Sequence, residues 1–334
     1  MPSADILESI GLGLNSGIRE HFVKKKVMLL CTLTIAACSQ CGALDGLILK
    51  PSGTIRRLPT DFGYAFETKT VLTPQGHEIS LWHVSTNSPE RKGIIVTIPG
   101  NDANKSRYVV SLPLFADNGW DLILLDYTGF GESPGQPTLQ GLFDSAYGAI
   151  DYAKSQSDVV VGYGISLGTG VLARIAVDRE LTAVVFESMM VFYETPTLFA
   201  ENLGIDLPVF GLANWIAEAA STPDLDSKKW IQQVTEPKLF IHSPGDHVTP
   251  FAGAKEVFDL APAPKFMFVT QGEHALQAFL DPGLYRNVVN GWLDGVINRD
   301  PIENQLYLQI LEEEITAAFQ ALGLEPPPPG TFTP

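Results

Sequence analysis

The chain contains short apolar segments that alternate with stretches of helical periodicity. Six of these segments are nearly continuous runs of aliphatic and aromatic residues, at positions 93–98, 121–127, 158–163, 182–187, 238–242 and 265–269. A continuous apolar run is typical of a strand that is buried on both faces of a parallel sheet. Because helical stretches separate the runs, the pattern predicts an α/β fold with a mostly parallel central sheet and helices on both faces.

Residues 65–84 show a different pattern ahead of these runs. Two strand-like segments flank the turn sequence Pro-Gln-Gly-His at positions 74–77. This arrangement predicts two antiparallel strands joined by a tight turn.

The spacing of these elements predicts one large domain with extensions at both ends. We expect the domain to span residues 62–297, with residues 188–236 as an insertion that forms a small helical lid. Residues 298–334 combine a helical pattern with a proline-rich end, so they predict an accessory helix and an extended tail.

One apolar run leads into a helical pattern through the sequence Gly-Ile-Ser-Leu-Gly at positions 164–168. Glycines on either side of a serine allow a sharp connection from strand to helix, with the serine hydroxyl exposed at its apex. The backbone N–H of Leu167 lies at the start of the predicted helix, where it can bind an oxyanion. Ser166 is therefore a candidate nucleophile.

The same glycines also match a pattern found in some dinucleotide-binding folds. Gly164, Gly168 and Gly170 spell G-x-x-x-G-x-G, and Glu187 ends the next predicted strand, where a ribose-binding carboxylate would fall. However, the motif lies in the middle of the chain, and no Tyr-x-x-x-Lys pair follows it. A dinucleotide-binding protein is therefore the less favoured alternative.

A serine nucleophile needs a base, and the base needs a carboxylate to orient it. Asp246 and His274 each follow a predicted strand, at the sheet edge where parallel sheets place their sites. Both are candidates for these roles. His247 is the alternative base, although adjacent residues such as Asp246 and His247 usually point apart, and Glu187 is the alternative acid.

With these residues, the chain resembles the serine α/β-hydrolases, and most closely the Bem46-like and serine-aminopeptidase-like groups, over about residues 62–297. Its Pro-Gly-Asn at positions 99–101 matches an oxyanion loop that these families usually write His-Gly-Asn, with Pro99 in place of the histidine. Residues 126–133 match an Asp-x-x-Gly-x-Gly-x-Ser stretch, with Asp126, Gly129, Gly131 and Ser133, which we interpret as loop architecture.

The resemblance implies an α/β-hydrolase fold and a serine hydrolase that needs no cofactor. A carboxylic ester is the expected substrate, with a thioester or an amide less favoured. By the same analogy, the backbone N–H groups of Asn101 and Leu167 bind the oxyanion. The alternative is a non-catalytic binding protein that has kept the fold.

The start of the lid insertion is rich in large apolar side chains. Met189, Met190, Phe192 and Tyr193 are candidates for a pocket that takes a small-molecule or lipid-like ester. Ordinary packing of helices onto the sheet is the alternative explanation.

Composition excludes several other classes of protein. The net charge of −16 argues against nucleic acid as a partner, because polyanions would be repelled. All three cysteines precede the domain and the sequence has no His-Glu-x-x-His motif, so we expect neither a thiol nucleophile nor a metal site.

The N-terminal segment predicts targeting to a membrane. Three lysines precede the apolar run 27–37, which is too short to span a bilayer but fits a signal peptide. The sequence Ile-Ala-Ala-Cys at 35–38 resembles a bacterial lipoprotein signal. We therefore expect residues 1–37 to be removed (signal 23–37, with translation starting at Val23) and residues 38–61 to form a linker.

Under this interpretation, Cys38 carries a lipid anchor and the protein is an extracytoplasmic membrane lipoprotein. Ser39 follows the cysteine, which by resemblance favours the outer membrane where the cell has one. The alternative is an N-terminal helix in a cytoplasmic enzyme.

Overall fold

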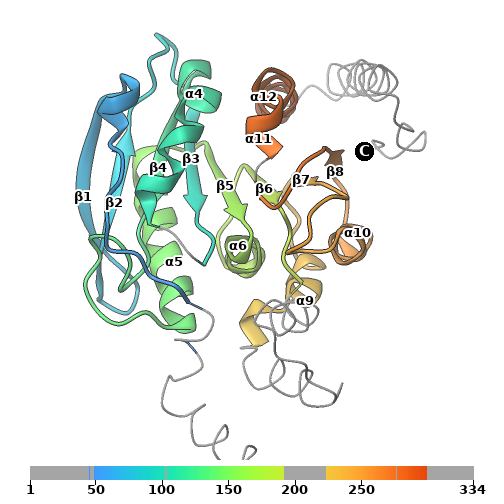
Figure 1. The fold of residues 1–334 in the computed structure, drawn as a ribbon, viewed down its shortest axis with the longest axis horizontal. Helices are drawn as coiled ribbons and strands as arrows, with labels where there is room; N and C mark the ends of the chain where they lie inside the picture. Colours follow the sequence, from blue (N-terminus) through green and yellow to red (C-terminus); the bar gives the residue numbers. More distant parts are fainter. Residues whose placement is uncertain (1–44, 46–48, 102–103, 192–222, 276, 299–334) are drawn as a thin grey trace, which may run out of the picture. The chain divides into compact units, whose positions relative to one another are not determined.

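The computed structural model describes residues 45, 49–101, 104–191, 223–275 and 277–298. In this part of the chain, eight strands form one sheet in the order β1-β2-β4-β3-β5-β6-β7-β8 (Figure 1). The strands are β1 (Phe66–Leu72), β2 (Glu78–Val84), β3 (Gly93–Ile98), β4 (Trp120–Leu125), β5 (Val160–Ile165), β6 (Ala183–Glu187), β7 (Lys238–His242) and β8 (Lys265–Val269).

The strand directions agree with the predictions from the sequence. Strands β1 and β2 pair antiparallel, as do β2 and β4, whereas all the other neighbours pair parallel. The six apolar runs are the six strands β3 to β8. Because β3 lies between β4 and β5, the chain changes direction across the sheet at β3, and such a switch opens a crevice beyond the strand ends.

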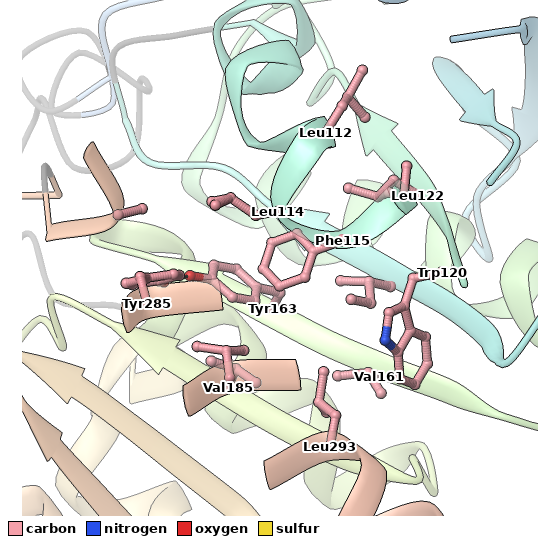
Figure 2. Packing of buried hydrophobic residues seen from close by; sticks show 14 of the residues in the cluster. Leu112, Leu114, Phe115, Trp120, Leu122, Val161, Tyr163, Val185, Tyr285 and Leu293 are labelled. Carbon is pink, nitrogen blue, oxygen red and sulfur yellow. Dashed lines mark hydrogen bonds between the residues drawn. The ribbon is translucent and has the colours of Figure 1, made fainter. Parts of the chain in front are cut away.

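Helices cover both faces of the sheet. On one face, Leu112 and Phe115 of α4 (Leu112–Phe115) and Leu293 of α12 (Pro282–Asn298) share a buried cluster with Val161 and Val185 of the sheet (Figure 2). The remaining elements are η1 (Pro59–Phe62), η2 (Lys105–Ser111), η3 (Ala116–Asn118), η4 (Pro223–Leu225), α5 (Leu139–Gln156), α6 (Leu167–Asp178), α9 (Ser227–Ile231), α10 (Phe251–Leu260) and α11 (Gln277–Leu280).

The opposite face of the sheet packs against α6 and α10. A Cβ on Gly162 of β5 would lie 2.5 Å from a Leu172 methyl group of α6, and the ring of Phe240 in β7 lies 5.4 Å from that of Phe258 in α10. Alternate residues of β5 therefore face opposite helix layers, which explains why its sequence is apolar throughout.

Several predicted features lie outside the described residues. These are the signal segment, Cys38, residues 192–222 of the predicted lid with Phe192 and Tyr193, and the tail 299–334. Within the described ranges, no helix is both long enough and apolar enough to cross a bilayer.

Candidate active site

Ser166 stands between the end of β5 and the start of α6 in an unusual backbone conformation. Its φ is 54° and its ψ is −122°, a region that is costly for a residue with a side chain. Hydrogen bonds hold it there: its N–H donates to the carbonyl of Glu187 at 3.0 Å, and its own carbonyl accepts from the Thr169 hydroxyl at 2.6 Å. The structure therefore forms the sharp connection that the motif predicts.

The two glycines of the motif are required by close backbone contacts. A Cβ on Gly164 would lie 2.8 Å from the carbonyl oxygen of Gly168. A Cβ on Gly168 would lie 2.6 Å from the carbonyl oxygen of Pro99 and closer still to that of Ile98. The close approach of β5 to α6 accounts for Gly164, and the close approach of α6 to the end of β3 accounts for Gly168.

The structure brings Ser166, His274 and Asp246 together in one hydrogen-bonded chain. The Nε2 atom of His274 lies 2.8 Å from the Ser166 hydroxyl oxygen. On the other side of the ring, Nδ1 lies 2.9 Å from Oδ2 of Asp246 and 3.1 Å from Oδ1. The three residues come from the ends of β5, β8 and β7, as the sequence predicts.

Asp246 is buried and is held as a carboxylate. Its oxygens accept hydrogen bonds from the Thr249 N–H at 2.8 Å, the Thr249 hydroxyl at 2.9 Å and the Val248 N–H at 3.0 Å. Burial acts to raise the pKa of Asp246, but the hydrogen bond and charge of His274, with the bonds from Thr249, outweigh it and lower the pKa to about 2. An ionised Asp246 favours the tautomer of His274 that has its proton on Nδ1.

The loop that carries His274 is fixed by a serine that was not predicted from the sequence. The hydroxyl of Ser188, directly after β6, accepts the N–H of Ala275 at 3.0 Å. Both residues have positive φ, 53° for Ser188 and 52° for Ala275. Ser188 and Thr249 are residues that sequence reasoning missed. Of these two, only Thr249 could have been found from the local sequence. It lies three positions after Asp246, and an aspartate often accepts a backbone N–H at that spacing in a turn.

A second histidine, His242, is neutral and supports the loop that carries Asp246 (the acid loop). Nδ1 of His242 accepts the Met189 N–H at 3.1 Å, and its Nε2–H donates to the carbonyl of Thr249 at 2.8 Å. Burial lowers the pKa of His242, which keeps this arrangement of one donor and one acceptor. His242 therefore ties the start of the lid insertion to the acid loop.

The alternative acid and the alternative base lie in other environments. Oε2 of Glu187 accepts hydrogen bonds from the hydroxyls of Tyr163 and Tyr285, the latter at 2.9 Å, and Figure 2 shows both tyrosines. Burial raises the pKa of Glu187 despite these two bonds. His247 is exposed, and His274 is the histidine bonded to Ser166.

The predicted oxyanion loop passes directly beside the serine. A Cβ on Gly100 would lie 3.5 Å from the Cβ of Ser166, and Asn101 is the next residue. Leu167 is the first residue of α6, so its N–H is one of the donors that have no partner within the helix. Leu167 directly follows Ser166, and Asn101 follows the glycine that passes beside Ser166. Their role as oxyanion donors stays a prediction.

A buried ion pair anchors the far end of the oxyanion loop. Nζ of Lys105 lies 2.5 Å from Oδ2 of Asp126, and both side chains are fully buried. The Lys105 N–H also donates to Asp126 at 2.7 Å, and the Ser133 hydroxyl donates to the Asp126 carbonyl at 2.8 Å. A Cβ on Gly131 would collide with the Asp126 carboxylate. The motif at 126–133 is therefore loop architecture, as predicted.

The first residues of the predicted lid are bonded to α6, just after the sharp connection at Ser166 (the elbow between β5 and α6). Met189 and Met190 are buried, and the Met190 N–H donates to the Thr169 hydroxyl at 3.0 Å. Their contribution to a substrate pocket stays a prediction. Across the described residues, no group of three histidine, cysteine or acidic side chains is arranged to hold a metal ion.

Comparison with known sequences finds distant relatives. No model of a known protein family matches the chain. The uncharacterized protein YfhR of Escherichia coli strain K12 is 27% identical over 230 residues, which cover 65% of this chain and 76% of YfhR. Human ABHD12B is 25% identical over 179 residues, which cover 50% of this chain and 49% of ABHD12B.

Comparison with solved structures finds several esterases. The Pyrococcus furiosus esterase Pf2001 superposes with a TM-score of 0.62 at 15% identity, over 74% of this chain and 97% of that one. The esterase EaEST from Exiguobacterium antarcticum gives a TM-score of 0.53 at 15% identity, over 68% of this chain and 100% of that one. The α/β hydrolase GrgF from a Penicillium species gives 0.55 at 15% identity, over 70% and 98%. Together with the strand order, these likenesses show that the chain has the α/β-hydrolase fold.

Proposed function

We propose that the protein is a serine hydrolase that cleaves a carboxylic ester through an acyl-enzyme intermediate. The observation that carries this proposal is the hydrogen-bonded chain from Ser166 through His274 to Asp246. The esterases among the solved structures with the same fold support the choice of an ester over a thioester or an amide.

Each residue has a defined step in this reaction. His274 takes the Ser166 proton on Nε2 while the serine oxygen attacks the ester carbonyl, and Asp246 stabilises the imidazolium that forms. The N–H groups of Asn101 and Leu167 bind the tetrahedral oxyanion, at about 3 kcal/mol per donor. The intermediate collapses to an acyl-serine as His274 protonates the leaving alcohol. Water, activated by the same histidine, then releases the acid.

The test combines active-site labelling with a series of p-nitrophenyl esters of increasing acyl length. A fluorophosphonate probe is expected to label Ser166 in the wild type. Ser166→Ala and His274→Ala should each lower kcat by about 10⁴-fold or more, and the double variant should be little worse than either single variant because the residues act as a unit. His247→Ala is the matched control and should keep its activity.

Three results would contradict this proposal. Full activity in His274→Ala would overturn the assignment of the base. Absence of labelling and of turnover across the ester series, in a folded protein, would favour a non-catalytic binding protein. Binding of a nicotinamide dinucleotide without labelling would favour the dinucleotide-binding alternative.

A further inference from the structure

The peptide group between Pro99 and Gly100 is held on both of its edges by tyrosine hydroxyls. The hydroxyl of Tyr127 donates to the carbonyl oxygen of Pro99 at 2.8 Å. The N–H of Gly100 donates to the hydroxyl oxygen of Tyr108 at 2.8 Å. In a trans peptide the C=O and the N–H point in opposite directions, so the two tyrosines hold the same plane from opposite sides.

The two tyrosines come from different parts of the fold. Tyr127 lies two residues after β4 and is fully buried, with its ring 5.7 Å from that of Phe130. Tyr108 lies in η2, after the buried Lys105 that fixes the far end of the same loop. Each ring is therefore held by its own surroundings, and the peptide takes its orientation from two separate supports.

This peptide lies where its orientation affects the reaction centre. The Pro99 carbonyl oxygen would be 2.6 Å from a Cβ on Gly168, so it packs against the first turn of α6 beside Leu167. On the other side, Gly100 passes beside Ser166, and Asn101 follows it. Because a peptide is planar, rotation of the Pro99–Gly100 plane changes the direction in which the chain enters Asn101.

We propose that Tyr108 and Tyr127 are positioning residues that set the oxyanion hole by fixing the Pro99–Gly100 peptide. This proposal rests on the proposed function. Neither tyrosine transfers a proton or touches the reacting atoms. Together they hold the Asn101 N–H at a fixed place relative to that of Leu167, so that both donors meet the oxyanion only as it forms.

The test replaces each hydroxyl and keeps each ring. In Tyr127→Phe and Tyr108→Phe, kcat for a p-nitrophenyl ester is expected to fall at least tenfold while KM changes less than twofold, because the donor is misplaced for the transition state. Binding of a trifluoromethyl ketone, whose adduct with serine carries an oxyanion, should weaken in parallel with kcat. The double variant should lose less than the product of the two single losses, because both bonds act on one peptide.

Tyr64→Phe is the matched control. Tyr64 is buried, and its hydroxyl donates to Asp117 at 2.9 Å, away from the oxyanion loop. Its removal costs a partly buried hydrogen bond of a buried tyrosine. The values of kcat and ketone binding should therefore stay within twofold of the wild type. Circular dichroism and a urea midpoint show whether each variant is folded. If Tyr127→Phe does not fold, the kinetics of Tyr108→Phe alone test the positioning role.

The outcomes separate this proposal from the proposed function. If Ser166→Ala abolishes turnover but both tyrosine variants keep their kcat, the positioning role is wrong and the hydrolase assignment stands. An equal loss in Tyr64→Phe would also overturn the positioning role, since general loosening would then explain the effect. If Ser166→Ala retains turnover, the hydrolase assignment itself fails.

Discussion

Two carboxylic acids lie at neighbouring strands near the candidate nucleophile, and their surroundings shift their pKa values in opposite directions. Glu187 is the last residue of β6, and Asp246 lies in the loop after β7. Asp246 accepts hydrogen bonds from two backbone N–H groups, a threonine hydroxyl and His274. Glu187 accepts hydrogen bonds from the hydroxyls of Tyr163 and Tyr285, but burial outweighs them and raises its pKa. Opposite pKa shifts of two acids in one site suit them to different roles, and Asp246, the acid bonded to His274, is the one whose pKa is lowered.

Asp246→Asn tests the ionised acid. Since the folded state lowers the pKa of Asp246 from 3.8 to about 2, the unfolded state binds more protons between those values. The stabilisation is complete above about pH 5 and is lost as the pH falls through 2. At pH 7 we expect the variant to lose about 2 kcal/mol of unfolding free energy and about 10³-fold to 10⁴-fold in kcat. The stability difference should shrink toward pH 2.5, as measured by urea titrations.

Glu187→Gln is the companion variant for the acid whose pKa is raised. An amide can accept the same two tyrosine hydrogen bonds and adds no charge, so kcat should stay within about threefold of the wild type. Because the raised pKa of Glu187 means that ionisation in the folded state is unfavourable, the wild type should lose stability relative to the variant as the pH rises above 4.5. A kcat loss comparable to that of Asp246→Asn would instead point to Glu187 as the acid.

At the scale of elements, the sequence predicts the strands, which depend on local pattern. It does not predict contacts between segments that are distant in the chain, which depend on how the elements pack. Continuous apolar runs predict β3 to β8 because those strands are covered on both faces, and the candidate nucleophile, acid and base each follow such a run. The supporting residues Ser188 and Tyr108 have no local pattern. Their partners, Ala275 and Gly100, become neighbours only through strand order and loop packing, so no periodicity could reveal them.

The elbow between β5 and α6 gives a prediction at this scale. In Gly168→Ala, the added methyl group meets backbone carbonyls of Ile98 and Pro99 that have no room to move, so we expect a loss of about 1–3 kcal/mol in stability and a strong loss of activity. Gly170→Ala in the same helix meets neighbouring atoms only at 3.4–3.5 Å. This control should be neutral, or more stable by up to about 1 kcal/mol, because alanine favours a helix. Thermal unfolding and kcat, measured for both variants, test this difference between Gly168→Ala and Gly170→Ala. Equal losses of stability and activity in the two variants would contradict the prediction.

At the scale of the whole molecule, charge bears on the choice of substrate. The chain has 38 acidic and 22 basic residues, a net charge of −16, and the exposed Glu273 lies directly beside His274 in the sequence. A field of one sign repels ligands of the same sign and lowers their rate of encounter, and salt screens it over about 8 Å at physiological ionic strength.

We therefore expect discrimination against anionic esters. The p-nitrophenyl monoester of a dicarboxylic acid should show a kcat/KM several-fold below that of a neutral ester of equal chain length. Raising sodium chloride from 20 to 500 mM should narrow the gap by increasing kcat/KM for the anionic ester, because the repulsion is screened, while the neutral ester serves as the control and changes little. The p-nitrophenolate release rate at low substrate concentration measures both values. A preference for the anionic ester, or a gap that does not depend on salt, would show that local positive charge in the pocket outweighs the net charge of the molecule.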